Sequence, residues 1–379
     1  MKPKIIALYL PQFHPTQEND EWYGKGYTEW TNVAKAKPIF KGHEQPKVPT
    51  YLGFYDLRYP EIKEEQAKLA QEAGVTAFCY YHYWFGNGKQ LLQTPLEQVV
   101  STGKPDFPYC ICWANHSWYK KLFNPDTSKI DNTLIMEQTY PGEEDIIAHF
   151  NYLLPAFQDQ RYQKVNGRLL FVIYEIHHVP NFEQFKTIWN RLAKENGLPY
   201  FYFLSFANSL EELEEMKKEK TDGIILSLLH HMEPRPGGTK WNTLMFHVKN
   251  YWYKWIQHRP RLVYDYKKVM KGFIHPVMKE DNIVPVIIPN WDTTPRRSLG
   301  ALILNNPKPK YFKEHVKDAL QIIADKPKEK QIIFLKSWNE WGEGNYMEPD
   351  LKYGKGYIQA LREALDEEVP NDNNNDNDN

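Results

Sequence analysis

The sequence has few cysteines and almost no excess charge. Only 3 cysteines occur among 379 residues, and Cys79, Cys110 and Cys112 all lie inside apolar runs. Because their number is odd and their spacing fits no disulfide framework, we expect buried, reduced thiols and a reducing compartment. The 47 basic and 48 acidic side chains leave a net charge of -1. With so little net charge, the protein has no overall electrostatic attraction to nucleic acid or to an anionic membrane, and we expect no nucleic-acid partner.

Signals of several common protein classes are missing as well. No run of about 18 apolar residues is long enough for a transmembrane segment, and the first apolar run, Ile5 to Leu10, is too short for a signal peptide. There is no Gly-rich phosphate loop and no metal-site spacing, since the pairs His177-His178 and His230-His231 would point apart on a strand. We therefore expect a soluble, cytoplasmic protein without metal or other cofactor. The missing nucleotide signals weigh against a conventional sugar-nucleotide transferase.

Aromatic residues, by contrast, are abundant. The chain has 12 Trp, 25 Tyr and 19 Phe, which make up 15% of its residues. Flat rings with a polar edge stack well on the C–H faces of sugars, so this composition favours a carbohydrate-binding site. A core rich in large side chains would give the same composition, and both interpretations stay open at this point.

Short apolar runs that alternate with longer helix-prone stretches are the main structural signal, and such alternation is expected of βα units. The runs are "KIIALYL" (4–10), "VTAFCYYHYW" (75–84), "YCICWAN" (109–115), "LLFVIYE" (169–175), "YFYFLSF" (200–206), "GIILSLLH" (223–230), "IVPVIIPNW" (283–291) and "QIIFLKSW" (331–338). Between them, residues 60–74, 181–197 and 209–220 have the pattern of helices. A doubly wound sheet shares this alternation, but eight is the strand number of a (β/α)8 TIM barrel, and this α/β fold is our prediction.

Two long insertions interrupt this pattern, after the first and the sixth predicted strands. Residues 11–59 are rich in Gly, Pro and Trp and predict a folded lid over the end of the first strand. Residues 232–280 are basic and aromatic; they predict a helix with an extension that packs on the barrel, or else a surface for an acceptor or a membrane. We expect residues 1–368 to form a single catalytic domain and residues 369–379, rich in Asn and Asp, to form a disordered tail.

Polar and aromatic side chains gather where the predicted strands end. In a TIM barrel the carboxyl ends of the strands surround one mouth, where the active site forms. Carboxylates, amides, imidazoles and Trp rings together are suited to bind sugars. The predicted substrate-binding residues are Tyr9, His14, Tyr81, Tyr83, Trp84, Trp113, Asn115, His116, Glu175, Asn290, Trp291, Asp292, Arg296, Trp338, Asn339 and Trp341. The same strand ends also carry Gln12, His82, Trp118, Tyr174, His177, Ser205, Asn208, His230 and His231.

Two acids in the stretch "KSWNEWGEGNYMEPD", residues 336–350, are the predicted catalytic pair. Glu340 and Glu343 are three residues apart in a turn after the eighth strand, and in a helical turn this spacing puts side chains on one face. Chemistry at a glycosidic bond commonly uses two carboxyl groups that flank the bond. A solvated acidic loop is the alternative, but it would normally lack the flanking Trp338 and Trp341. We assign no role to Glu348, for which a rim or structural position is expected.

Several longer motifs resemble those of a known family. They are "IALYLPQFHPTQENDEWYGKGYTEWTNVAKAKPIFKGHEQP", "LGFYDLR", "AFCYYHYWF", "KPDFPYCICWAN", "WDTTPRR" and "SWNEWGEG". Over about residues 4–365 the chain resembles the WbsX family of bacterial polysaccharide-locus proteins, which is similar to the glycoside hydrolase family 99 endo-α-mannosidases. This resemblance implies a retaining mechanism in which Glu340 assists the sugar 2-hydroxyl as a base, and Glu343 is the general acid that later becomes the base. Two positions depart from the family 99 pattern: Gly342 stands where that family has His, and His116 where an acidic residue is expected.

WbsX proteins are commonly described as glycosyltransferases of O-antigen or capsular polysaccharide assembly, which includes lipopolysaccharide biosynthesis. The resemblance therefore implies a carbohydrate-active enzyme with an oligosaccharide or polysaccharide substrate and, as one option, a lipid-linked acceptor. We favour the glycosyltransferase. The alternative is an endo-acting glycoside hydrolase similar to family 99, because a retaining site can pass its sugar to a hydroxyl or to water. A non-catalytic glycan-binding barrel is a third interpretation.

Overall fold

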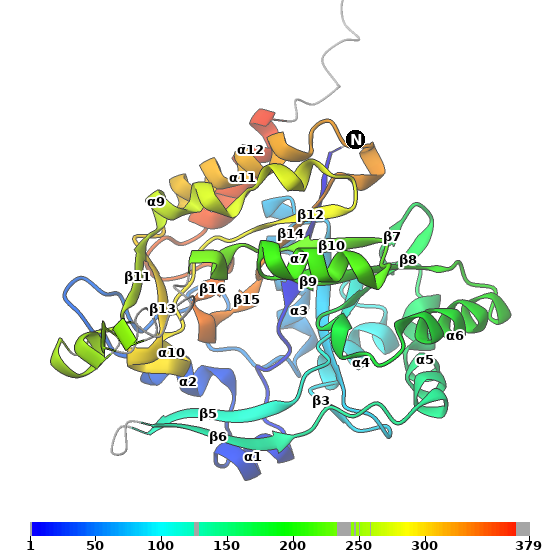
Figure 1. Ribbon diagram of the computed structural model, residues 1–379, viewed down its shortest axis with the longest axis horizontal. Coiled ribbons are helices and arrows are strands. Elements are labelled where there is room, and N and C mark those ends of the chain that lie inside the picture. Colours follow the sequence, from blue (N-terminus) through cyan, green and yellow to red (C-terminus); the bar gives the residue numbers. More distant parts are fainter. Residues whose placement is uncertain are drawn as a thin grey trace, which may run out of the picture.

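A closed barrel of eight parallel strands forms the centre of the molecule (Figure 1). The computed structural model describes residues 2–124, 129–232, 244–245, 248–249, 251–257 and 259–368. The strands follow one another around the barrel in sequence order, and the last pairs with the first. They are β1 (Lys4–Tyr9), β2 (Ala77–Trp84), β4 (Tyr109–Trp113), β8 (Arg168–Ile173), β9 (Phe201–Ala207), β10 (Gly223–Leu226), β12 (Ile283–Ile287) and β14 (Ile332–Leu335). The predicted TIM barrel is confirmed, and all eight predicted strands are present.

The strands are buried on both faces, as their nearly continuous apolar sequences predict. Along β1, every residue from Ile5 to Tyr9 is fully buried. One hydrophobic core fills the barrel and the layer between the barrel and its helices. As predicted, Cys79, Cys110 and Cys112 are unpaired and buried in this core.

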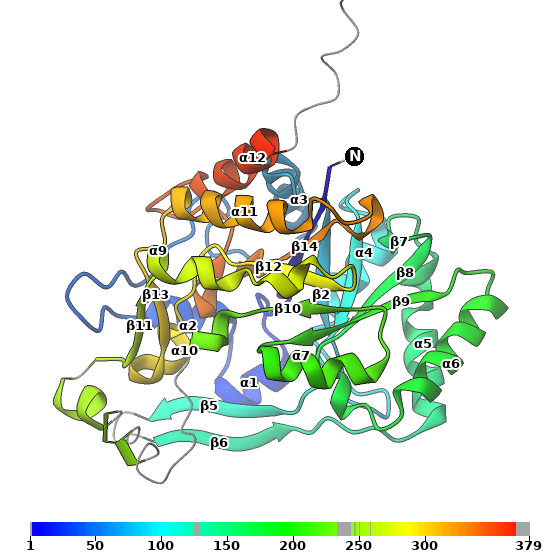
Figure 2. The ribbon, with the colours of Figure 1, turned by 45° about the horizontal axis from the view of Figure 1, so that its top comes forward.

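Helices surround the barrel (Figure 2). The longer ones are α3 (Pro60–Ala73), α4 (Thr94–Thr102), α5 (Glu143–Gln158), α6 (Phe182–Glu195), α7 (Leu210–Met216), α11 (Pro309–Ile323) and α12 (Gly356–Glu368). The predicted helices 60–74, 181–197 and 209–220 correspond to α3, α6 and α7. Helix α3 ends at Gly74, whose φ of 90° is left-handed and therefore favours glycine. No helix in the described part of the chain is long and apolar enough to cross a membrane.

The insertion at residues 11–59 folds at the end of the barrel opposite the N-terminus, where the strands finish. It contains α1 (Gln17–Tyr23) and α2 (Glu29–Lys35), which both views place at this end (Figures 1 and 2). Trp30 of α2 packs on Phe13 with ring centroids 4.5 Å apart, and its indole N–H donates to the carbonyl of Tyr55. Aromatic contacts thus anchor the insertion and hold α2 beside the barrel mouth.

A further insertion follows the third barrel strand, and the sequence analysis missed it. Strands β5 (Trp118–Asn124) and β6 (Lys129–Met136) form an antiparallel hairpin that lies at the same end of the molecule as α1 (Figures 1 and 2). Strand β5 mixes aromatic, charged and apolar residues without the strict alternation that marks a half-buried strand. This irregular pattern explains why the hairpin escaped prediction.

The structure describes only part of the insertion at residues 232–280. There, β11 (Leu262–Asp265) pairs with β13 (Leu302–Asn305), and α9 (Tyr266–Val269) follows directly. Tyr266 is fully buried and donates its hydroxyl to the carbonyl of Ile288, so this end of the insertion packs on the barrel. The predicted disordered tail, residues 369–379, lies outside the described residues.

Candidate active site

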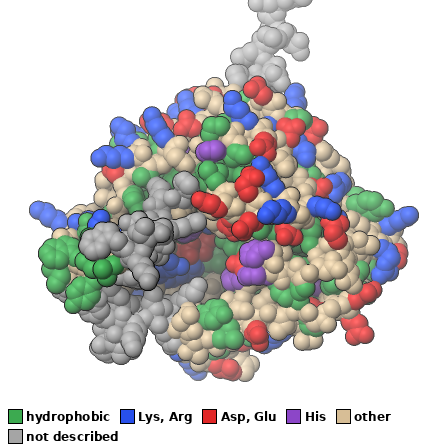
Figure 3. Space-filling view, viewed as in Figure 1, with side chains coloured by type: hydrophobic (Ala, Val, Ile, Leu, Met, Phe, Trp, Pro, Cys, Tyr) green, Lys and Arg blue, Asp and Glu red, His purple; other side chains and the backbone are tan. Residues whose placement is uncertain are grey.

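A cavity of about 430 Å³ opens where the barrel strands end. Figure 3 shows a hollow in one face of the molecule, with acidic and basic side chains inside it. Seven of the eight barrel strands, or the loops after them, contribute to the lining, together with α1, α2, α10 (Thr294–Arg297) and β5. This is the position at which a TIM barrel assembles an active site.

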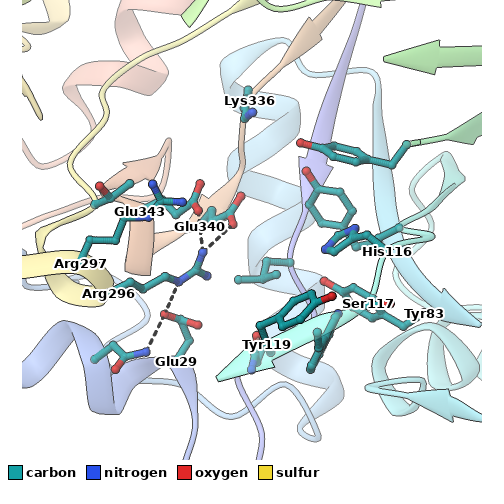
Figure 4. Close-up of a pocket in the computed structure, with 18 of the residues that line it drawn as sticks. Glu29, Tyr83, His116, Ser117, Tyr119, Arg296, Arg297, Lys336, Glu340 and Glu343 are labelled. Carbon is teal, nitrogen blue, oxygen red and sulfur yellow. Dashed lines mark hydrogen bonds and ion pairs between the residues drawn. The ribbon is translucent and has the colours of Figure 1, made fainter. Parts of the chain in front are cut away.

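Three carboxylates meet one arginine in this cavity (Figure 4). The Arg296 Nη1 atom donates to Glu343 Oε1 at 2.8 Å and to Glu340 Oε1 at 3.3 Å. The Arg296 Nε atom donates to Glu29 Oε1 at 2.9 Å. Glu29 is 2% exposed and comes from α2, so the insertion at residues 11–59 supplies one member of the cluster. Arg296 therefore offsets part of the repulsion among the three acids.

A tight turn after β14 positions the two predicted catalytic acids. Strand β15 (Asn339–Glu340) pairs with β16 (Asn345–Tyr346), and a 3-10 turn, Trp341–Glu343, connects them. Glycine is required at two points of this turn. A Cβ atom added at Gly342 would overlap the Glu29 carboxylate, and Gly344 has a left-handed φ of 55°. The Glu29 carboxylate, from another element, thus occupies the space that a side chain at position 342 would need.

Burial changes the acid strength of Glu340, which is 8% exposed. The loss of water raises the pKa of its carboxyl to about 7 and the neighbouring Glu343 adds to the rise, while Arg296 opposes it. The Ser337 hydroxyl donates a hydrogen bond to Glu340 at 3.3 Å. A carboxyl with such a pKa exchanges its proton near neutral pH, as a general acid or base must.

Aromatic side chains form much of the remaining wall, and most are tyrosines. They are Tyr23, Tyr27, Tyr81, Tyr83, Trp118, Tyr119, Tyr174 and Trp291. Burial, reinforced by the charge of Glu340, raises the pKa of Tyr81 well above its ordinary value. Its hydroxyl is therefore protonated at physiological pH and can donate a hydrogen bond to a sugar oxygen.

The structure brings together eight of the eighteen predicted site residues at this cavity. The predicted residues that line it are Tyr81, Tyr83, His116, Glu175, Trp291, Arg296, Glu340 and Glu343. Gln12, Trp118, Tyr174 and His230, noted at the strand ends, line it too.

Other predicted residues lie outside the cavity lining and are buried in the surrounding scaffold. They are Tyr9, His14, Trp84, Trp113, Asn115, Asn290, Asp292, Trp338, Asn339 and Trp341. Asn339, for example, bonds both the N–H and the carbonyl of Leu10, and Asp292 accepts from His43 and Gln45. Their amide and carboxylate groups form hydrogen bonds with buried polar groups of the loops around the mouth. The sequence alone does not distinguish this structural role from sugar binding.

The structure corrects the prediction that Trp338 and Trp341 bind the substrate. Trp338 and Trp341 are fully buried and do not line the cavity. The Trp341 ring stacks on Tyr346 with centroids 3.7 Å apart, and its N–H donates to Glu348 at 2.6 Å. Glu348 is buried and also accepts from Tyr55 and Gln66, so it has the structural position that was expected of it.

Several cavity residues were missed because the sequence does not show which side chains of the loops and insertions turn toward the cavity. They include Tyr23, Tyr27, Glu29, Asn32, Ser117, Tyr119, Arg297 and Lys336. The first four come from the insertion at residues 11–59. Its high content of aromatic and polar residues was a signal for a lid, but nothing in its spacing singled out Glu29.

Among the residues that the structure describes, one group of side chains could hold a metal ion. Ligand atoms of Glu175, His177 and His178 all lie within 4.8 Å of one another. The two histidines belong to a 3-10 turn, Ile176–His178, so the expectation that they point apart on a strand is wrong. The carboxylate of Glu175 lies 2.6 Å from His178 Nδ1, which already accounts for the cluster as an acid–imidazole contact.

Sequence comparison places this chain among known proteins. Residues 5–361 match the profile of the family described as "Glycosyltransferase WbsX". The chain belongs to the WbsX family. It is also 31% identical over 365 residues to proteins described as "Uncharacterized protein WxcX" from two strains of Xanthomonas campestris pv. campestris, B100 and ATCC 33913. The match covers 95% of this chain but 49% of those relatives, so the chain spans about half their length.

Solved structures with the same fold include glycoside hydrolases. The GH99 endo-alpha-mannosidase from Bacteroides thetaiotaomicron has a TM-score of 0.54 at 17% identity, with coverage of 96% of this chain and 97% of that one. A structure described as "Glycoside hydrolase-like protein" has a TM-score of 0.59 at 12% identity, covering 96% and 94% of the two chains. At such identities the similarity establishes a shared fold, and the resemblance of this WbsX chain to the GH99 fold is confirmed.

Proposed function

We propose that this chain is a metal-independent enzyme that acts at glycosidic bonds through Glu340 and Glu343. The observation that carries the proposal is the convergence of both carboxylates on one atom, Arg296 Nη1, inside the cavity at the barrel mouth. Distances of 3.3 and 2.8 Å to a common atom keep the two bonded oxygens at most about 6 Å apart. Retaining glycosidases hold their carboxyl groups about 5 to 5.5 Å apart and inverting enzymes about 6.5 to 9.5 Å, so the geometry supports retention.

The two acids take the roles that the resemblance to family 99 implies. Glu340 acts as the base on the sugar 2-hydroxyl, and Glu343 protonates the leaving oxygen and later takes a proton from the acceptor. Arg296 stabilises the negative charge that moves between them during the reaction. Tyrosine hydroxyls on the wall bind the sugar hydroxyls.

Membership of the WbsX family supports the transferase direction, with the sugar passed to a growing surface polysaccharide of the O-antigen or capsular type, in free or lipid-linked form. An endo-acting hydrolase is the second candidate, and the fold shared with the GH99 endo-alpha-mannosidase favours it. Incubation of bacterial O-antigen and capsular oligosaccharides with and without sugar nucleotides, followed by mass spectrometry, separates the two. Products that form without a sugar nucleotide would exclude an obligate nucleotide-sugar transferase, and a strict requirement for one would exclude the hydrolase.

The pH profile tests the assignment of the two acids. Because the pKa of Glu340 is about 7 in the free protein, kcat/KM should rise with pH through neutrality if Glu340 must be ionised to act as the base. A fall through the same range would assign it the acid role instead. Glu340→Gln and Glu343→Gln should each lower turnover by orders of magnitude, and activity near that of the unaltered enzyme in both variants would reject Glu340 and Glu343 as the catalytic pair.

A further inference from the structure

Lys336 is a buried cation that the proposed reaction does not use. It follows β14 directly, lines the cavity and is 4% exposed. In the parts of the chain that the structure describes, no carboxylate lies within ion-pair distance of its Nζ atom, and no acceptor forms a hydrogen bond with it. Its Nζ stands 5.1 Å from the centre of the Trp291 ring.

The two other buried lysines in the described part of the chain each have at least one hydrogen-bond acceptor. Lys63 Nζ donates to the carbonyl of Leu57 and to Gln98 Oε1, each at 2.7 Å. Lys326 Nζ donates to the carbonyl of Ile283. Removing an ammonium group from water without an acceptor is costly, which is why buried lysines elsewhere in the fold are paired. Lys336 Nζ is not one of the fully enclosed polar atoms without a partner; it opens to the cavity, where its N–H donors are available to a bound group.

The surroundings of Lys336 hold its charge in place without cancelling it. The face of the Trp291 ring attracts an ammonium ion but leaves its charge and its N–H donors available, which a carboxylate partner would not do. Figure 4 shows Lys336 and Arg296 on opposite sides of Glu340. Arg296 is occupied by its three carboxylates, whereas Lys336 faces the open cavity.

We infer that Lys336, held by the Trp291 ring, forms a subsite for an anionic substituent of the sugar bound beside Glu340. The substituent is an oxyanion, either the carboxylate of a uronic acid or a phosphate ester. This inference rests on the proposed function, since it names the substrate class of the same cavity. Lys336 acts as a specificity residue and takes no part in proton transfer.

Binding to matched sugars tests the subsite without any need for turnover. The probes are the methyl glycosides of glucose, galactose and mannose, each with its uronate and its 6-phosphate, titrated into the full chain by calorimetry. At least one acidic member should bind about tenfold more tightly than its neutral counterpart, the value of one charge-assisted hydrogen bond. Whether the uronate or the phosphate is preferred identifies the source of the oxyanion.

Two variants of Lys336 make the test specific. Lys336→Met keeps the length and burial of the side chain and should abolish the preference for the acidic sugar, whereas Lys336→Arg keeps the charge and should retain most of it. Thermal unfolding of both variants checks that they fold. No preference in any set of sugars, or a preference that survives in Lys336→Met, would overturn the subsite. Equal weakening of acidic and neutral sugars would assign Lys336 only to the charge balance of Glu340 and would overturn it too.

The binding experiment tests the subsite independently of whether Glu340 and Glu343 are the catalytic residues. A preference for acidic sugars that depends on Lys336 supports the subsite even if both glutamate variants keep activity. Loss of activity in the glutamate variants without any such preference would leave the catalytic proposal intact and reject the subsite.

Discussion

Replacing Glu340 with Gln should make the protein more stable at alkaline pH, although it removes a proposed catalytic group. The pKa of Glu340 rises from its ordinary 4.5 to about 7 in the folded chain, chiefly through burial, with a further contribution from Glu343. Between these two values the folded state keeps a proton that the unfolded state has lost. The free energy of unfolding therefore falls as pH rises through this interval, and above pH 7 the ionised carboxylate destabilises the folded state.

The size of the effect follows from the same two values. A tenfold change in proton affinity corresponds to about 1.4 kcal/mol, so the charge on Glu340 costs the fold about 3 kcal/mol at pH 8. Gln is neutral at every pH and keeps one oxygen that can accept from Arg296. We expect Glu340→Gln to raise the free energy of unfolding by about 2 to 3 kcal/mol at pH 8 and to leave it nearly unchanged at pH 4.5.

Urea unfolding followed by tryptophan fluorescence, at several pH values between 4.5 and 8.5, measures this difference without a substrate. Glu65→Gln is the matched control, because the Glu65 side chain is partly exposed and its ion pair with Lys68 lies on the surface. Other titrating groups are common to both proteins and drop out of the comparison. A Glu340→Gln protein that is less stable than the unaltered one by the same amount at pH 4.5 and pH 8 would refute the reasoning.

Three further substitutions probe the scaffold of the site. Gly342→Ala should lower the free energy of unfolding by about 1 to 3 kcal/mol and reduce turnover, because the added methyl group overlaps Glu29, whereas Gly300→Ala, in open space, should change stability by less than about 0.5 kcal/mol. Glu29→Gln should loosen Arg296 and lower kcat more than tenfold while the chain still folds, which circular dichroism and rate measurements would check. Glu348→Ala leaves three buried donors without an acceptor and should cost about 3 kcal/mol or more by urea unfolding; a change below about 1 kcal/mol would contradict its structural role.

Much of the barrel could be predicted because its signals are local. Each strand is a short apolar run next to a helix-prone stretch, so the eight runs, such as residues 4–10 and 331–338, could be counted in order. The hairpin of β5 and β6 escaped because its sequence lacks such a signal. Glu340 and Glu343 could be singled out because they lie together in one turn after the last strand.

The sequence by itself determined the barrel, the WbsX resemblance and the pair of acids in the turn after β14, because all of these depend on neighbours along the chain. Only the tertiary structure decided which side chains reach the cavity. Residues far apart in sequence meet there: Glu29 and Arg296 are 267 positions apart, yet 2.9 Å separates their bonded atoms. The direction of each side chain depends on how loops pack over the mouth, which buries Trp338 and leaves Lys336 facing the cavity without a carboxylate or hydrogen-bond acceptor among the described residues.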